Sequence, residues 1–209
     1  MYKNNSKDKP YYTQRNNKIK PGSSCNVTSM IAALSAAGWP VEKMVAKNQQ
    51  AEDDLLLFIM TDAVVDKKWR SLDPEGKIPP NEWHAVLAFG TNRWLKSKGY
   101  NCLPVVFREA VALDEIQKTV KAGGACVVSG RFPYETGSLD HVVAVVGIDE
   151  TSLIVDDPFG DWHDEYATIK GDDIKMDSSE FYSLLKPLGA VKKWAHIVEP
   201  FKEVASYES

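Results

Sequence analysis

Residues 141–158 read HVVAVVGIDETSLIVDDP and contain two apolar, β-branched runs joined by the turn at residues 149–151. Each run has the length of one buried strand and is too short for a typical helix. Two consecutive strands with a short connection favour an antiparallel hairpin. In such a hairpin the start of the first strand lies beside the end of the second. We therefore expect His141 to lie close to Asp156 and Asp157.

The rest of the chain divides into a helical first half and a strand-rich second half. Three segments of the first half are predicted helices: residues 25–37, 51–69 and 83–98. The second half adds predicted strands to the hairpin and intersperses two helices; the strands are 103–107, 125–129 and 195–198, and the helices are 113–122 and 181–185. This order indicates an α+β fold. We expect residues 1–10 to be a flexible polar arm and residues 11–209 to form a single domain.

Composition excludes several classes of protein. The 209 residues are 44% hydrophobic and 26% charged, as in a soluble globular domain with a sizeable core. A formal charge of −4 argues against a general nucleic-acid binder. No apolar run reaches the roughly 18–20 residues of a membrane span, and the polar start lacks the apolar segment of a secretion signal. We expect a soluble protein that is cytoplasmic at synthesis.

Cys25 is the candidate nucleophile. It follows the loop residues Pro21 to Ser24 and opens the first predicted helix. A thiol in the first helical turn lies near the positive end of the helix dipole, which favours the reactive thiolate. The other two cysteines, Cys102 and Cys126, lie in or beside strand-like apolar runs and are predicted core thiols. With three widely spaced cysteines and no CxxC pair, neither a disulfide framework nor a zinc knuckle is expected.

A thiol hydrolase also needs a base for the sulfur proton and an acceptor that orients the base. His141 begins a predicted strand, from which its side chain can project into a cleft at the sheet edge. Either Asp156 or Asp157 could orient it, because adjacent strand residues point to opposite faces. His163 stands among acidic residues, but its spacing matches no metal-ligand signature, so we expect no metal or cofactor.

Five features occur in an order that resembles the C39-like branch of the papain-like cysteine peptidases: Gln14, Cys25, residues 113–124, residues 141–147 and residues 157–160. The resemblance covers about residues 11–160. It implies a papain-like fold, in which a helix with the nucleophile at its N-terminus packs on an antiparallel sheet. It further implies Cys25 as nucleophile, His141 as general base and acid, and Asp157 before Pro158 as the orienting acid. Gln14 would donate to the oxyanion together with the backbone N–H of Cys25.

The implied activity is hydrolysis of a peptide or related amide bond through a thioester. The expected partner is a polypeptide or a peptidoglycan peptide, and a lysin-type peptidoglycan cross-link hydrolase would act on the cell wall after release. One departure is Asn26, where many relatives have glycine after the cysteine. It keeps two alternatives open: a catalytically inactive papain-like binding protein, and an acyltransferase that uses the same triad.

Overall fold

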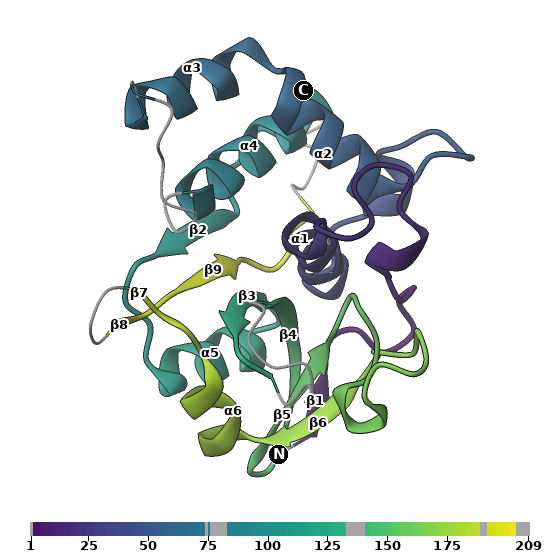
Figure 1. The fold of residues 1–209 in the computed structure, drawn as a ribbon, viewed down its shortest axis with the longest axis vertical. Coiled ribbons are helices and arrows are strands. Elements are labelled where there is room, and N and C mark those ends of the chain that lie inside the picture. Colours follow the sequence, from purple (N-terminus) through teal and green to yellow (C-terminus); the bar gives the residue numbers. More distant parts are fainter. Residues whose placement is uncertain (1, 74, 76–82, 133–140, 189–191, 204–209) are drawn as a thin grey trace.

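The structure is a computed structural model that describes residues 2–73, 75, 83–132, 141–188 and 192–203. Over these ranges the chain is α+β, with six α-helices and an antiparallel sheet of seven strands (Figure 1). The predicted fold class is thereby confirmed. None of the helices in these ranges has the length and hydropathy that a transmembrane segment requires.

The helices of the first half gather at one end of the molecule, apart from α1, which lies in the middle (Figure 1). The six α-helices of the described residues are α1 (Cys25–Ala36), α2 (Ala51–Thr61), α3 (Ala63–Leu72) and α4 (Trp83–Ser97) in the first half, and α5 (Leu113–Lys121) and α6 (Ser178–Leu184) in the second. A short 3-10 helix, η1 (Gln14–Asn16), precedes α1.

The main sheet has the spatial strand order β2-β9-β3-β4-β5-β6, and β1 pairs with β4 as well. Its strands are β1 (Tyr2–Asn4), β2 (Val105–Arg108), β3 (Ala125–Gly130), β4 (His141–Asp149), β5 (Ser152–Asp156), β6 (Ile174–Asp177) and β9 (Ala195–Val198). A separate pair joins β7 (Pro187–Leu188) to β8 (Lys192–Lys193). The predicted hairpin is confirmed as β4 and β5, whose register places Ala144 opposite Asp156.

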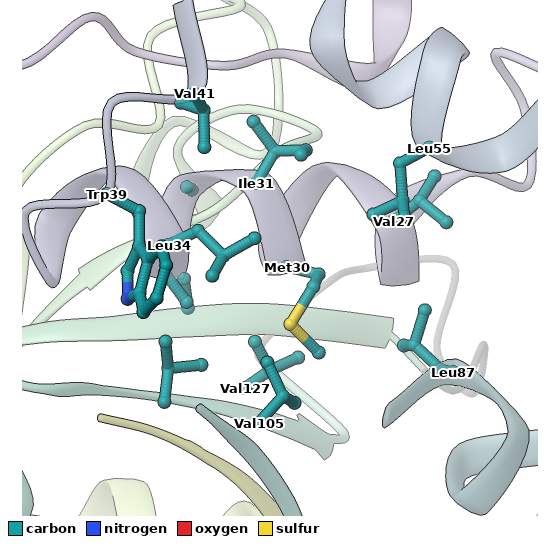
Figure 2. Close-up of a cluster of buried hydrophobic side chains, with 14 of the residues drawn as sticks. Val27, Met30, Ile31, Leu34, Trp39, Val41, Leu55, Leu87, Val105 and Val127 are labelled. Atoms are coloured by element: carbon teal, nitrogen blue, oxygen red, sulfur yellow. The ribbon is translucent and has the colours of Figure 1, made fainter. Parts of the chain in front are cut away.

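The central strands are apolar throughout because helices cover both faces of the sheet. On one face, Val127 and Ala144 belong to a core shared with α1, α2 and α4. Figure 2 shows Met30 pointing from α1 toward Val105 and Val127 of the sheet. A fully buried side chain of this size stabilises the fold by about 1.5–3 kcal/mol.

The opposite face of the sheet carries a second core, formed with α5 and α6. Val128 of β3 and Val143 of β4 pack there with Ile116 of α5 and Phe181 of α6. Helix α5 presents Ile116 and Val120 to the sheet at helical spacing, as its sequence pattern predicts. Helix α1 therefore lies on one face of the sheet, and α5 and α6 pack on the other.

The helix predicted over residues 51–69 is in fact two helices, so this expectation is corrected. Helix α2 ends at Thr61, and Asp62 has an extended backbone. The Asp62 carboxylate accepts hydrogen bonds from the backbone N–H groups of Val64 and Val65 and so caps α3. It also pairs with Arg93 of α4 at 2.8 Å. The apolar pattern predicts one continuous helix, but the helix breaks at Asp62 because its side chain caps α3 and binds α4.

The expectation of a flexible arm does not hold for the start of the chain. Residues Tyr2–Asn4 form β1, antiparallel to Gly147–Asp149 of β4. The Asn5 side-chain amide then donates to the carbonyls of Val120 and Gly124. Hydropathy patterns do not predict this strand, because two of its three side chains are polar. Its stability comes from backbone pairing with β4.

Candidate active site

The N-terminus of α1 places Cys25 at one end of the sheet. Cys25 is the first residue of the helix and is partly buried. The first backbone hydrogen bond of the helix runs from Thr28 N to Ser24 O, so the Cys25 N–H precedes the intrahelical ladder. One turn on, the Ser29 hydroxyl donates to Val142 O at 2.9 Å. This bond joins α1 to the start of β4, where His141 lies.

His141 and Asp157 meet as the hairpin geometry predicts. The distance from His141 Nε2 to Asp157 Oδ1 is 2.6 Å. The Asp157 side chain is fully buried, and that of His141 is 17% exposed. A buried carboxylate at this distance fixes the orientation of the imidazole and favours its protonated form.

The Cys25 side chain lies close enough to the imidazole to contribute to the raised pKa of His141. Burial alone would lower the pKa of His141, but the Asp157 charge and hydrogen bond outweigh it, and contact with Cys25 adds to them. Together they raise the pKa of His141 from 6.5 to about 10. The arrangement therefore favours an imidazolium beside the Asp157 carboxylate.

The Asp157 carboxylate is itself held from several directions. Oδ1 also accepts from Phe159 N at 2.8 Å, and Oδ2 accepts from the Tyr166 hydroxyl at 3.2 Å. Asp157 N donates to Gly171 O at 2.7 Å. At Gly171 a Cβ atom would overlap Asp157 O, so only glycine allows this close approach of the two backbones.

Asp156, the open alternative, points away from His141. Its Oδ1 accepts from Asp173 N at 3.0 Å. Burial, followed by the charges of Asp173 and Asp172, raises the pKa of Asp156 to about 7, although the Asp173 N–H bond opposes this. Of the two adjacent carboxylates, Asp157 is the one in contact with the imidazole.

Gln14 lies in η1 and is buried, with 2% of its surface exposed. Its Nε2 donates to Pro21 O at 2.9 Å, in the loop that leads to Cys25. Its backbone N–H donates to Pro158 O at 2.9 Å, directly after Asp157. An amide nitrogen has two hydrogens, and the Pro21 carbonyl binds one of them. Gln14 thus joins the loop before Cys25 to the loop after Asp157, and one N–H of its side-chain amide is not used by the Pro21 carbonyl.

Asn26 does not obstruct this arrangement. Its side-chain oxygen accepts from Val27 N at 2.8 Å, within the first turn of α1. That bond satisfies one of the free N–H groups of the helix start and leaves the Cys25 N–H to other acceptors.

Aromatic residues around His141 were not identified from the sequence. The rings of Phe132, Phe159 and Tyr166 stand roughly perpendicular to the imidazole, with centroids 6.2–6.4 Å away. They come from separate segments, so no local motif brings them together. Trp162 stacks on Phe132 at 5.1 Å. These rings keep water from the His141–Asp157 pair.

The remaining thiols and histidines lie elsewhere. Cys126 is buried in β3, as predicted, and burial raises the pKa of its thiol to about 12. The prediction of a core thiol is wrong for Cys102, which is exposed. His196 is buried, and its Nε2 lies 2.8 Å from His84 O. Within the described ranges, no cluster of histidine, cysteine and acidic side chains has the geometry to hold a metal ion.

Comparisons with known proteins identify the family and the fold of the chain. The family model described as Peptidase_C39 like family matches residues 6–188. A crystal structure of a protein assigned as a C39-like peptidase from Bacillus anthracis has the same fold, with a TM-score of 0.54. That protein is 19% identical, and the match covers 92% of this chain and 96% of that one. A comparison with curated protein sequences finds no match.

Proposed function

Because the chain belongs to the Peptidase_C39-like family, we propose that it is a cysteine peptidase with Cys25 as its nucleophile. The observation that supports this proposal is the 2.6 Å pair of His141 with Asp157, beside a Cys25 side chain close enough to contribute to the raised pKa of the imidazole. In this assignment His141 is general base and acid, Asp157 orients it, and Gln14 stabilises the oxyanion.

The proposed acylation begins from a thiolate–imidazolium pair, since the raised pKa of His141 keeps its ring protonated at neutral pH. The sulfur attacks the carbonyl carbon of the substrate, and the carbonyl oxygen becomes an oxyanion. The free N–H of Gln14 Nε2 and the backbone N–H of Cys25 donate to that oxygen. When the C–N bond breaks, the His141 imidazolium gives its proton to the departing amine and a thioester remains.

Deacylation reverses the proton transfers. The now neutral His141 removes a proton from water, and the resulting hydroxide attacks the thioester carbonyl. The same two donors bind the second oxyanion. When the C–S bond breaks, the carboxylic acid leaves, and the sulfur departs as thiolate beside the reprotonated imidazole. Asp157 keeps the ring oriented throughout without taking a proton.

The substrate we propose is a peptide or related amide, and a lysin-type action on peptidoglycan cross-links is one specific form of it. Purified cell walls and a denatured protein should be incubated in parallel with the wild type and with Cys25→Ala. We expect the wild type to cleave at least one of them and Cys25→Ala to cleave neither. Release of soluble peptides from the walls, with no cleavage of the denatured protein, would identify the lysin activity. Cleavage that persists in Cys25→Ala would refute the assigned nucleophile.

Iodoacetamide labelling tests the same proposal without a substrate. At mildly acidic pH Cys25 should react well before Cys102 and Cys126, because only Cys25 has an imidazolium partner. Labelling at the rate of a free model thiol would refute the peptidase chemistry and leave a binding protein as the better description. Cys25→Ala should also unfold at nearly the wild-type temperature, since a partly exposed first-turn thiol buries little area.

A further inference from the structure

A buried polar cluster lies directly behind the nucleophile, among otherwise apolar packing. Its members have 6% or less of their surface exposed and come from α1, from α2 and from residues that flank η1 and α1: Thr13, Asn17, Ser24, Thr28 and Glu52. Buried polar groups are costly unless they are hydrogen-bonded, so such a cluster has strict geometric requirements.

Asn17 is the centre of this cluster. Its side-chain amide has the hydroxyls of Ser24 and Thr28 on one side, at 2.9 and 3.0 Å. On the other side lie Thr13 O at 3.3 Å and Glu52 Oε1 at 3.2 Å. A backbone carbonyl can only accept, so the amide nitrogen faces Thr13 and Glu52 while the amide oxygen accepts from the two hydroxyls. All four bonds are then satisfied.

Helix α2 holds the adjacent residues in the same way. The Asp53 carboxylate accepts from the backbone N–H groups of Lys18 and Ile19, each at 2.9 Å. Asp53 is buried, with 7% of its surface exposed. Two bonds from one carboxylate to consecutive N–H groups fix the path of the chain directly after Asn17.

This path determines where the Gln14 amide points. Pro21 O accepts from Gln14 Nε2, and Asn17 N donates to Gln14 O at 3.1 Å. Both ends of Gln14 are therefore tied to the segment from Asn17 to Pro21. A shift of that segment would move the free N–H of Gln14 relative to Cys25.

We propose that Asn17 is a positioning residue that fixes the Gln14 amide against Cys25 and thereby sets the oxyanion donors. This inference rests on the peptidase function proposed above. Asn17 touches neither the substrate nor the sulfur. It acts through the loop between them, and misplacement of a donor by about 1 Å can cost about 100-fold in rate.

Two reactions of the same cysteine separate this role from a merely structural one. Alkylation by iodoacetamide needs the thiolate–imidazolium pair but no oxyanion donor, whereas amide hydrolysis needs both. We expect Asn17→Ala to lose about 10- to 100-fold in hydrolysis, measured per rapidly alkylated Cys25, and to keep nearly the wild-type alkylation rate. Thr28→Val removes one of the four bonds with little change of shape, and we expect it to cause a smaller loss of hydrolysis at an unchanged alkylation rate. This variant carries the test if Asn17→Ala does not fold.

A double variant tests whether Asn17 acts through Gln14. Gln14→Ala with Asn17→Ala should hydrolyse no more slowly than the slower single variant, because both remove the same interaction. The matched control is Asn92→Ala. Like Asn17, Asn92 forms hydrogen bonds through both amide atoms, here to Val105 O and N at 2.7 and 3.0 Å, but it joins α4 to β2. Asn92→Ala should lower stability and leave hydrolysis per alkylated Cys25 unchanged.

Two results would overturn the positioning role while the peptidase proposal stands. One is unchanged hydrolysis in both Asn17→Ala and Thr28→Val. The other is an equal fall of alkylation and hydrolysis, which would mean that the cluster supports the fold of Cys25 itself. A wild type whose Cys25 alkylates no faster than a free thiol would instead overturn the peptidase proposal, and the positioning role with it.

Discussion

At the scale of single residues, the Asp157 carboxylate dominates the electrostatics of the site. It is fully buried, and its Oδ1 accepts from both His141 Nε2 and Phe159 N. Its charge is the largest of the influences that raise the pKa of His141 to about 10. The protonation of the imidazole therefore depends on a side chain that substrate need not touch.

Asp157→Asn tests this dependence. The amide removes the negative charge, so the pKa of His141 should fall and the imidazolium should be lost at lower pH. The rate of Cys25-directed hydrolysis, followed from pH 6 to 11, should decline on the alkaline side near pH 10 in the wild type and at distinctly lower pH in Asp157→Asn. An alkaline limb at the same pH in both proteins would contradict the assignment of Asp157.

Sequence alone brought His141 near two carboxylates but could not choose between them on geometry, because adjacent strand residues face opposite ways. The family resemblance favoured Asp157, and the structure places that side chain, not Asp156, against the imidazole. Asn17 and Tyr166 could not have been found this way. Their contacts depend on how loops fold back on themselves and on α1 and α2, and no recognised spacing motif encodes those contacts.

At the scale of elements, the break between α2 and α3 depends on Asp62. Its carboxylate caps α3 through Val64 and Val65 and binds Arg93 of α4. The bond with Arg93 is the main reason that the pKa of Asp62 lies below its usual value. One residue therefore sets the angle between two helices and joins them to a third.

Asp62→Ala should reduce the free energy of unfolding by about 1–2 kcal/mol, mostly through loss of the cap. Urea titration would measure this change. The control is Asp66→Ala, which removes an exposed pair with Arg70 within α3 and should change stability by about 0.5 kcal/mol or less. Equal losses of unfolding free energy in the two variants would show that the Asp62 cap stabilises the protein no more than the exposed Asp66–Arg70 pair does.

Elements with strong hydrophobic patterns were predicted well, and those without were not. The apolar runs of β3, β4 and β5 and the amphipathic α5 have their expected positions. The three-residue strand β1 is polar at two of its positions and pairs across more than 140 residues of sequence. A strand of this kind is stabilised by backbone bonds to a partner that the local sequence does not reveal.

At the scale of the whole molecule, the site lies where two separately packed cores meet. The core with α1 supplies Cys25, and the core with α5 and α6 lies behind the start of β4 and the end of β5. Forming the His141 contacts thus requires both halves to be folded. The protonation of His141 should consequently be linked to global unfolding.

Among the strongly shifted groups of the described residues, His141 alone has its ordinary and its raised pKa on either side of pH 7 to 9; the raised pKa values of Cys126, Tyr11 and Tyr12 affect stability only above about pH 9. The pKa values of His84 and His196 are lowered by burial to about 3 and about 4, so they weaken the fold as pH falls below 6.5. Burial raises the pKa values of Glu52 and Asp156 to about 7, so their stabilisation is lost as pH rises toward neutrality. Below pH 7 the two histidines and the two carboxyl groups therefore change the free energy of unfolding in opposite directions. Neither pair changes it much above pH 7.

His141 has a folded-state pKa of about 10 against 6.5 when unfolded, so the native state holds more protons between these values. Its stabilisation is complete below about pH 6.5 and is lost as pH rises toward 10. Urea unfolding of Cys25→Ala, which retains Asp157 and the imidazole, should show a free energy that declines over this window. Adding His141→Ala should flatten the decline, even though the double variant is less stable at neutral pH. Parallel curves for the two proteins would mean that the imidazole gains no proton on folding, and the proposed ion pair would have to be abandoned.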